Sequence, residues 1–479
     1  MLRSLPMNPK PLLLLLGAAL GLCGCGSSLS SQQLPQKWST GFWFWQGSDA
    51  GPPTTHDLID DLFVHVGTIS SNANPFDVSR QSGRPAHWFA YGRLPDRMPA
   101  AREYWVVFRY ERRGIPDLQA VPVLAQSLSD LKEDATARHL NVRGLQLDID
   151  SPTASLAEYA RFLNEVKRHL PKGWQLSITA LLDWFRDGTA IAEVVDAADE
   201  FVPQFYDVGD FKGESHIAIA TGVDGPTAIA MKIDAHRWGP VFNRFRKPFR
   251  VGISSFGRAR QVLSDSQPQS RYSRITFLRN IAPLDLATNS AFQLQAGHNQ
   301  SDELVLSYSA TRNVEIGYSR FGPGDGVQFI LATQQLVREA VASAKQMAGR
   351  ITGVVFFRWP GAEEALTMQP DEVLEAAGKP SSNSHRPNRI RLVNGGCAAV
   401  ECVDIYMEGA DPFAPEPVRY RIRASNELEY FIPDEGVPAQ MTAPTELELS
   451  LPPFCARGLL YLGRAVSRKH LDFTVAREP

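Results

Sequence analysis

The sequence predicts an α/β fold: a (β/α)8 TIM barrel with a β-hairpin insertion, followed by a small all-β C-terminal domain. Eight short β-like runs alternate with helical stretches between residues 38 and 379, which is typical of parallel strands joined by crossover helices, and eight is the strand count of that barrel. Several runs are apolar almost throughout, as strands buried on both faces should be. Beyond residue 388, short strand-like runs are separated only by turn residues.

Residues 1–24 are predicted to be a lipoprotein signal peptide. A basic start precedes an apolar run over residues 12–22, which is too short to span a bilayer permanently. The run ends in Leu-Cys-Gly-Cys and resembles the bacterial lipobox, which implies cleavage before Cys25 and lipidation of that residue. A plain secretory signal is the alternative. Residues 25–37 are then a flexible tether rich in Ser and Gln.

The predicted location follows from this signal. The mature chain is expected in the cell envelope, attached to the membrane through the lipid anchor only. Gly26 rather than Asp follows the lipidated cysteine. By resemblance to bacterial sorting habits, this favours the outer membrane, facing the periplasm, in a Gram-negative host.

The predicted barrel occupies residues 38–379. Its eight strands are expected at residues 41–45, 62–68, 104–110, 142–150, 175–181, 201–206, 249–256 and 354–359. Apolar positions recur at helical spacing over 156–170, where Pro171 ends the helix, and again over 336–347. Residues 70–100 lack this periodicity, so a loop or hairpin replaces a helix there. Residues 283–331 are predicted to form the β-hairpin insertion and one wall of a cleft.

The C-terminal part begins after a linker. Residues 380–388 are rich in Pro, Ser and Asn, and residues 389–479 are predicted to form the small β domain. Arg419, Arg421 and Arg423 alternate with Tyr420 and Ile422, which predicts one buried face and one basic face in water.

Three cysteines remain after the signal region: Cys397, Cys402 and Cys455. An exported compartment permits disulfides, so one bridge and one free thiol are expected, with the pairing left open. The sequence contains no CxxC pair and no His-x-x-x-His spacing. A structural zinc site is therefore not predicted, and the proposed chemistry requires neither metal nor cofactor.

Composition limits the partners. Lys and Arg total 49 against 52 Asp and Glu, and the net charge of -3 provides no global field that would attract nucleic acid. No nucleic-acid partner is predicted. Aromatic residues reach 10% of the chain, which indicates either a surface that stacks against sugars or a plain aromatic core.

Two acids end the fourth predicted strand. Asp148 and Asp150 are two residues apart, so both side chains project to the same side, while Leu147 and Ile149 face the helices. Active sites of such barrels lie at the carboxyl ends of the strands. Two acids in a cavity of low dielectric cannot both ionise freely, so one is expected to stay protonated near neutral pH. Glycosidic cleavage needs such a general acid.

These runs resemble motifs of the chitinase-like family 18 glycosidases. Residues 143–150 (RGLQLDID) resemble the fourth-strand signature Asp-Gly-x-Asp-x-Asp-x-Glu, and residues 204–207 (QFYD) resemble the sixth-strand Met-x-Tyr-Asp. Trp359 falls where that family places a tryptophan under the sugar. Over nearly everything after residue 38, the chain resembles a bacterial lipoprotein family catalogued as domain of unknown function 3142, which belongs with the glycosidase-type barrels.

The resemblance implies a glycoside hydrolase-like protein that acts on an envelope or extracellular polysaccharide or oligosaccharide. Asp150 is the expected general acid and Asp148 the carboxylate that tunes it. The expected substrate-binding residues are Gln204, Tyr206, Asp207, Trp359 and Trp43. Because Trp43 and Trp45 point the same way along their strand, one of them at least is expected in the core.

Departures from the signature leave alternatives open. Arg143 and Gln146 replace two of its acids, and Asp150 is one methylene shorter than the expected Glu. A non-catalytic glycan-binding or envelope-assembly lipoprotein is therefore the main alternative. A metal-dependent deacetylase ranks lower because paired histidines are lacking.

Individual residues also have alternative roles. Asp148 and Asp150 could be structural acids paired with arginines such as Arg109 or Arg358. Asp207 or Asp183 could act across the barrel in a two-carboxylate mechanism, although Asp183 is first explained as a helix cap. His65 is expected to be a core histidine.

Overall fold

The structure is a computed structural model. It describes residues 38–45, 59–71, 87–112, 114–206, 229–264, 281–299, 301–317, 319–361, 364, 366–380, 389–397, 400–408, 417–434, 437–451 and 459–477. The predicted signal peptide and tether, Cys25, Asp207 and Cys455 lie outside these residues, as does most of the linker. In the described ranges, no helix combines the length and apolar character needed to cross a membrane.

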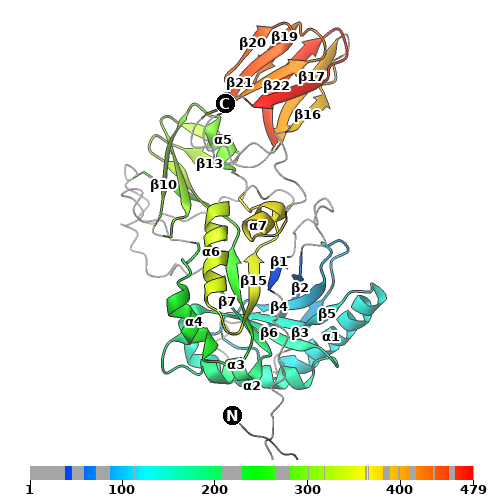
Figure 1. The fold of residues 1–479 in the computed structure, drawn as a ribbon, viewed down its shortest axis with the longest axis vertical. Coiled ribbons are helices and arrows are strands. Elements are labelled where there is room, and N and C mark those ends of the chain that lie inside the picture. Colours follow the sequence, from blue (N-terminus) through cyan, green and yellow to red (C-terminus); the bar gives the residue numbers. More distant parts are fainter. Residues whose placement is uncertain are drawn as a thin grey trace, which may run out of the picture. The chain divides into compact units, whose positions relative to one another are not determined.

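Eight parallel strands close into a barrel, which confirms the predicted fold class (Figure 1). The strands are β1 (Ser39–Phe44), β2 (Asp61–Ser71), β4 (Glu103–Tyr110), β5 (Val142–Ile149), β6 (Gln175–Ala180), β7 (Glu200–Pro203), β8 (Phe249–Ser254) and β15 (Ile351–Phe357). They follow the order β1-β15-β8-β7-β6-β5-β4-β2, and pairing of β2 with β1 closes the ring. Each of the eight predicted runs corresponds to one of these strands.

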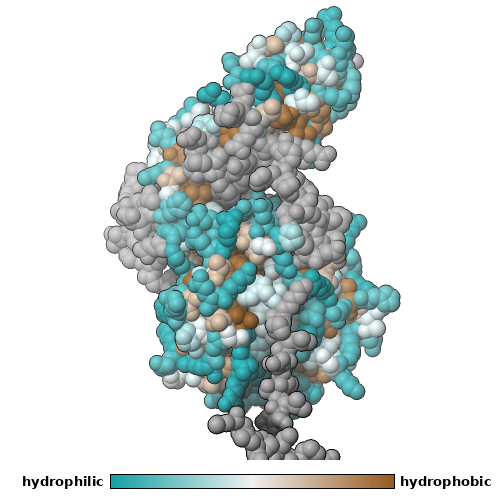
Figure 2. All heavy atoms as spheres, in the orientation of Figure 1, coloured by the Kyte–Doolittle hydropathy of each residue, from teal (hydrophilic) through white to brown (hydrophobic). Residues whose placement is uncertain are grey.

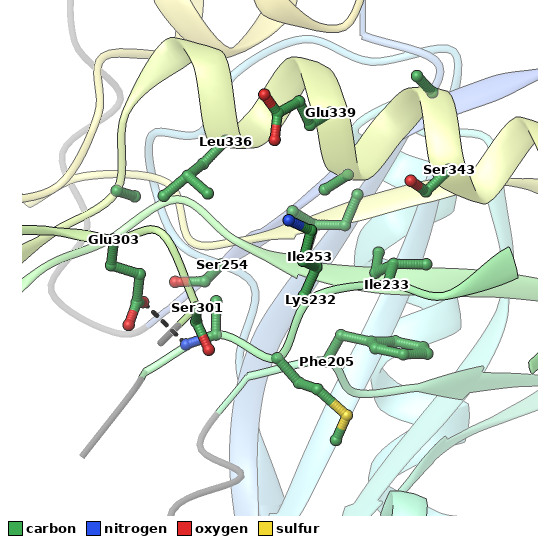
Figure 3. Close-up of a pocket in the computed structure, with 15 residues that line it drawn as sticks. Phe205, Lys232, Ile233, Ile253, Ser254, Ser301, Glu303, Leu336, Glu339 and Ser343 are labelled. Carbon is green, nitrogen blue, oxygen red and sulfur yellow. Dashed lines mark hydrogen bonds between the residues drawn. The ribbon is translucent and has the colours of Figure 1, made fainter. Parts of the chain in front are cut away.

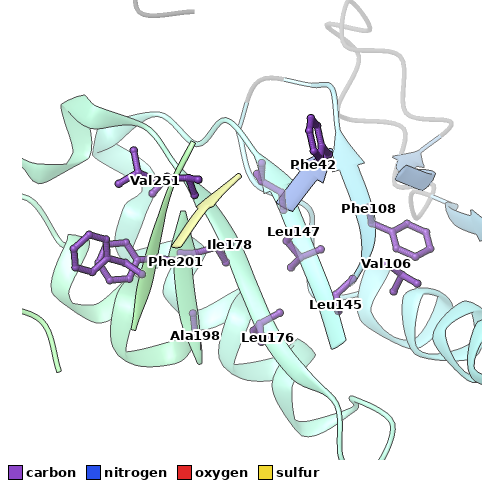
Figure 4. Close-up of a cluster of buried hydrophobic side chains, with 14 of the residues drawn as sticks. Phe42, Val106, Phe108, Leu145, Leu147, Leu176, Ile178, Ala198, Phe201 and Val251 are labelled. Atoms are coloured by element: carbon purple, nitrogen blue, oxygen red, sulfur yellow. The ribbon is translucent and has the colours of Figure 1, made fainter. Parts of the chain in front are cut away.

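Helices cover the outer face of the barrel. They are α1 (Ala120–Ala137), η3 (Thr153–Ser155), α2 (Leu156–Arg168), η4 (Leu182–Phe185), α3 (Ile191–Ala197), α4 (Ala235–Asn243), α6 (Gln334–Gln346) and α7 (Pro370–Ala376). Helix α2 buries one apolar stripe that includes Tyr159, Leu163 and Val166, as its periodicity predicted. Leu145 and Leu147 on β5 and Ile178 on β6 belong to the main core between strands and helices (Figure 4).

The barrel interior is filled in layers. Near the amino ends of the strands, Arg250 lies between Asp61 and Glu200, at 3.2 and 3.5 Å, and all three residues are buried. Above them, the rings of Phe63 and Trp105 stack with their centroids 5.7 Å apart. These layers close the lower barrel, so only its carboxyl end remains available for a ligand.

Two features depart from a simple barrel: a hairpin in the predicted region 70–100, and an insertion that begins before the predicted region 283–331. Strand β3 (Trp88–Gly92) pairs antiparallel with the end of β2, so a hairpin replaces a helix there. The insertion is a sheet of β9 (Arg258–Val262), β10 (Phe292–His298), β11 (Leu304–Ala310) and β14 (Gly326–Leu331), with a hairpin of β12 (Val314–Ile316) and β13 (Ser319–Phe321) and the short helix α5 (Pro283–Ala287). The insertion is therefore larger than one hairpin.

The C-terminal domain contains two four-stranded antiparallel sheets around a core of its own. One sheet holds β16 (Arg389–Asn394), β17 (Glu401–Glu408), β22 (Leu459–Ser467) and β19 (Tyr430–Pro433); the other holds β20 (Ala439–Ala443), β21 (Glu446–Leu451), β18 (Val418–Ala424) and β23 (Phe473–Arg477). Cys397 and Cys402 form a disulfide, which answers the pairing left open by the sequence.

The surface of the β domain follows the predicted alternation. On β18, Tyr420 and Ile422 are buried, and Arg421 and Arg423 form ion pairs with Glu446. The arginine row is thus a solvated and internally paired face. In the view of Figure 2, hydrophilic residues cover much of the described surface, with smaller hydrophobic areas between them.

Candidate functional site

The candidate site lies at the carboxyl end of the barrel, where inward-facing side chains of several strands meet. Asp148, near the end of β5, is 9% exposed. Its Oδ1 accepts a hydrogen bond from the Thr179 hydroxyl on β6 at 2.9 Å, and its Oδ2 lies 3.3 Å from Nη1 of Arg109 on β4. The carboxylate is therefore held from both sides by neighbouring strands.

Burial raises the pKa of Asp148 from 3.8 to about 6. The guanidinium of Arg109 lowers this pKa, the nearby Asp150 carboxylate raises it, and hydrogen bonds from Thr179 and Gln204 lower it. Because desolvation is the largest cause, Asp148 titrates near neutrality although it has a cationic partner. The neighbouring acid, which the sequence suggested as the cause of a raised pKa, thus has a smaller effect than burial.

Asp150 directly follows β5 and is solvent-exposed. Protein packed around its carboxyl still raises its pKa, Arg109 lowers it, and Asp183 raises it. In the described part of the chain, no hydrogen bond or ion pair involves the Asp150 carboxylate. Asp150 is thus an open acid at the barrel mouth, beside a buried and paired one. Arg109 engages Asp148, whereas Arg358 pairs with Glu364 and not with either acid.

An aromatic and cationic cluster flanks Asp148 on the β1 and β2 side. The half-buried ring of Trp45 stacks on the imidazole of His65 with centroids 4.2 Å apart, and the guanidinium of Arg109 lies 5.5 Å from the Trp45 ring. Burial, and then Arg109, lower the pKa of His65 to about 4, so the ring is neutral at physiological pH. A hydrogen bond with the Gly67 backbone raises the pKa of the buried His65, but by less than these two opposing effects lower it.

A second aromatic group lies across the barrel from Asp148. Phe357, at the end of β15, stacks on Tyr206 with centroids 4.9 Å apart and also contacts Trp43 and Trp45 edge-on. Gln204, half-buried, lies beside Asp148, and Tyr206 is buried. Gln204 and Tyr206 therefore lie in the same interior as the acids. Asp207, which the motif places with them, lies outside the described residues.

The structure revises the two tryptophans predicted to stack on sugar. Trp43 is 1% exposed and donates a hydrogen bond to Gln146 at 2.6 Å inside the barrel. Trp359 is 6% exposed and packs with Phe42 and Phe44 in the core between strands and helices. Neither ring offers an open face because each is covered by neighbouring side chains. The rings that line the mouth are instead those of Trp45 and Phe357.

The two replaced signature positions have structural roles. Gln146 is fully buried and joins the Trp43 indole to the Ser177 hydroxyl, to which it donates at 3.1 Å. Arg143 forms an ion pair with Glu103 at 3.0 Å. Asp183 lies in the first turn of η4 and accepts a hydrogen bond from Thr153 at 2.6 Å, without capping the helix.

A separate pocket of about 270 Å³ lies between the barrel and α6. Figure 3 shows Leu336, Glu339 and Ser343 on α6 facing the side of Phe205 and Ile253. The insertion contributes Ser301 and Glu303 to its wall, and the Glu303 carboxylate accepts hydrogen bonds from the backbone of Ile229 and Ala230, both at 2.9 Å. That acid therefore holds the insertion in place.

Within the described ranges, no cluster of three or more His, Cys, Asp or Glu side chains could hold a metal ion.

Comparison with known proteins adds a family match and a set of similar structures. The model of a family described as Domain of unknown function (DUF3142) matches residues 102–316, which include Arg109, Asp148 and Asp150. No curated protein matches the sequence significantly.

Three of the similar solved structures are described by their sequence identity, coverage and TM-score. The spore cortex-lytic enzyme SleL of Bacillus cereus is 10% identical, with a TM-score of 0.44 over 73% of this chain and 76% of that chain. The chitinase ChiA74 of Bacillus thuringiensis is 10% identical, with a TM-score of 0.43 over 92% and 100%. A glycoside hydrolase family 18 N-acetylglucosaminidase of Paenibacillus barengoltzii is 13% identical, with a TM-score of 0.41 over 71% and 99%.

Proposed function

We propose that the barrel mouth hydrolyses glycosidic bonds of a polysaccharide or oligosaccharide, with Asp150 as the general acid. The observation that carries this proposal is the pairing of unlike acids on one strand. The pKa of both acids is raised, but Asp150 is exposed and can reach a substrate, whereas Asp148 is buried against Arg109 and Thr179 and, with a pKa of about 6, is mostly ionised above neutral pH. Two carboxyls held in different environments are how one site supplies a proton donor and a carboxylate together.

In the proposed step, the protonated Asp150 gives its proton to the glycosidic oxygen as the bond from that oxygen to the anomeric carbon breaks. The Asp148 carboxylate, oriented by Arg109 and Thr179, stabilises the positive charge that develops on the sugar ring. A water molecule then adds its hydroxyl to the anomeric carbon and returns a proton to Asp150. Tyr206, Gln204 and Asp207 are proposed to orient the substrate.

The proposed place of action is the cell envelope, with the mature chain anchored through Cys25. The lipobox-like sequence that ends at Cys25 supports this proposal. Labelling of cells with an alkyne fatty acid is expected to tag the wild type and to leave a Cys25→Ser variant untagged. Equal labelling of both proteins would contradict lipidation at Cys25.

One observation favours a second candidate, a glycan-binding protein without catalysis. Gln146 and Arg143 occupy positions where the glycosidase signature has acids, and both are bonded into the barrel wall. A barrel that replaced catalytic acids by structural contacts could retain the mouth and still bind sugars. In that case Asp148 and Asp150 would bind substrate hydroxyls without transferring a proton.

Product release from a panel of purified polysaccharides distinguishes the two candidates. The panel should include chitin, peptidoglycan, cellulose and a neutral extracellular glycan, tested with the wild type, Asp150→Asn and Asp148→Asn. Asp130→Asn is the matched control because Asp130 is exposed on α1. We expect both mouth variants to lose about a hundredfold or more in rate. Hydrolysis that is unchanged in both variants would refute the assignment, and binding without hydrolysis would favour the second candidate.

A further inference from the structure

Strand β3 presents two large aromatic side chains to solvent. Phe89 is 53% exposed and Tyr91 is 78% exposed, and because they are two residues apart on the strand they lie on one face. In the described part of the chain, β3 is the last strand of its sheet and no further strand pairs with it. Aromatic rings exposed on a strand beside a proposed active site require an explanation.

The strand itself is held firmly by its other face. Ala90 is buried, and Trp88 packs against Tyr110 with ring centroids 6.2 Å apart. The Gly92 amide donates to the Ser127 hydroxyl of α1 at 2.9 Å, and a side chain at Gly92 would collide with Phe108. The exposure of Phe89 and Tyr91 is therefore a property of an anchored strand with one packed and one open face.

The strand register connects this open face to the two acids. Tyr91 pairs with Thr68 on β2, and Thr68 pairs with Arg109 on β4. Arg109 in turn pairs with Asp148 on β5. Residues paired across neighbouring strands project to the same face of a sheet, so these four form one row. Three strand spacings of about 4.8 Å give about 14 Å from Asp148 to Tyr91 along the sheet.

Polar side chains accompany the two rings. Ser70 pairs with Phe89, as Thr68 pairs with Tyr91, and both residues of β2 are only half-buried. A sugar ring has an apolar face of C–H groups and an equatorial rim of hydroxyls. Exposed aromatic rings beside hydroxyl groups fit both features, because the rings cover the apolar face and the Ser and Thr hydroxyls can bond the rim.

We propose that Tyr91 and Phe89 bind sugar units of the substrate beyond the cleavage point, so that the mouth takes a glycan chain in preference to a small sugar. This inference rests on the proposed function for the position of the acids. The row runs without interruption from Asp148 to Tyr91, so a glycan that is bound at the acids can extend along it to the two rings. For this reason we favour a glycan chain over a protein partner or a second copy of this chain.

The test measures binding in an Asp150→Asn background, so that the ligand stays intact. The full mature chain carrying Tyr91→Ala and Phe89→Ala is compared with the parent on insoluble chitin, peptidoglycan and cellulose, and on soluble trisaccharides of the same sugars. Tyr430→Ala is the matched control, because Tyr430 is 48% exposed on an edge strand of the C-terminal domain. We expect about tenfold weaker binding of the polymer that the parent binds, and trisaccharide affinity within about twofold.

Two results would overturn the inference. One is an affinity of the double variant for the polymer that equals that of the parent, or that falls by the same factor as its affinity for the trisaccharide. The other is self-association of the wild type, seen by analytical ultracentrifugation, that disappears in the double variant. Failure of the proposed function is separate: if the wild type hydrolyses no glycan but the double variant still loses polymer binding, the glycan surface stands and the catalytic assignment falls.

Discussion

Asp148→Asn is expected to stabilise the barrel at neutral pH. The native site raises the pKa of Asp148 from 3.8 to about 6, chiefly by burial. Native Asp148 therefore takes up its proton at a higher pH than the unfolded chain does. Native stability accordingly falls as pH rises from about 4 to about 6 and stays lowered above that window. Asparagine has the same size, carries no charge and can still accept the hydrogen bond from Thr179.

The magnitude follows from the same pKa. A change from 3.8 to about 6 corresponds to about 3 kcal/mol of penalty for the ionised native state. This penalty already includes the attraction to Arg109, and the weaker contact of the neutral amide with that guanidinium offsets up to about 1 to 2 kcal/mol of it. We therefore expect Asp148→Asn to be more stable than the wild type by about 1 to 3 kcal/mol at pH 7.5. The difference should largely disappear by pH 4.

Tryptophan fluorescence during urea unfolding can measure this difference. All nine tryptophans of the chain lie between residues 38 and 359, so their emission reports on the barrel and not on the β domain. Wild type, Asp148→Asn and the control Asp130→Asn should be compared at pH 7.5, 6 and 4. A difference between wild type and Asp148→Asn that is the same at all three pH values would refute the reasoning, since packing alone would then explain it.

Three further predictions concern other parts of the barrel. The pKa of His65 is about 4 because of burial and Arg109, so its NMR titration should have a midpoint near 4, and a midpoint near 6.5 would contradict the buried neutral ring. Arg250→Met leaves the buried Asp61 and Glu200 without their cation, so the free energy of unfolding should fall by about 3 to 5 kcal/mol. An unchanged urea midpoint would show that Arg250 does not stabilise these two acids. Gly67→Ala would place a Cβ 2.1 Å from the Tyr91 carbonyl oxygen and so separate β3 from β2. Amide hydrogen exchange on β3 should become faster and polymer binding should become weaker. Unchanged hydrogen exchange would contradict the pairing of β2 with β3.

The barrel could be predicted because its strands are buried on both faces. Runs such as residues 104–110 and 142–149 are apolar enough to be recognised without any partner. Edge strands β19 and β20 are hard to recognise from sequence, because Tyr430, Ile432 and Met441 are exposed and give no alternating core pattern. For the same reason the sequence indicated only a loop or hairpin where β3 lies.

The position of Asp148 and Asp150 at the end of one strand could be predicted, but the rings around them could not. Asp148 and Asp150 end an apolar strand, so their common side follows from the sequence alone. Trp359 was predicted from its place in the motif, but β15 ends at Phe357, so strand alternation no longer governs the side on which Trp359 lies. The sequence suggested Arg109 and Arg358 as possible partners of Asp148, and the register of β4 and β5, which a single sequence does not reveal, selects Arg109.

The proposed role of Asp150 is to deliver a proton to the leaving oxygen. It is tested most directly by the rate of Asp150→Asn on two substrates of the same sugar, one with an activated aryl leaving group and one with a natural sugar leaving group. We expect a loss of about a hundredfold or more on the natural linkage and a much smaller loss on the aryl glycoside, whose leaving group needs no proton. Equal losses on both substrates would contradict a general-acid role for Asp150.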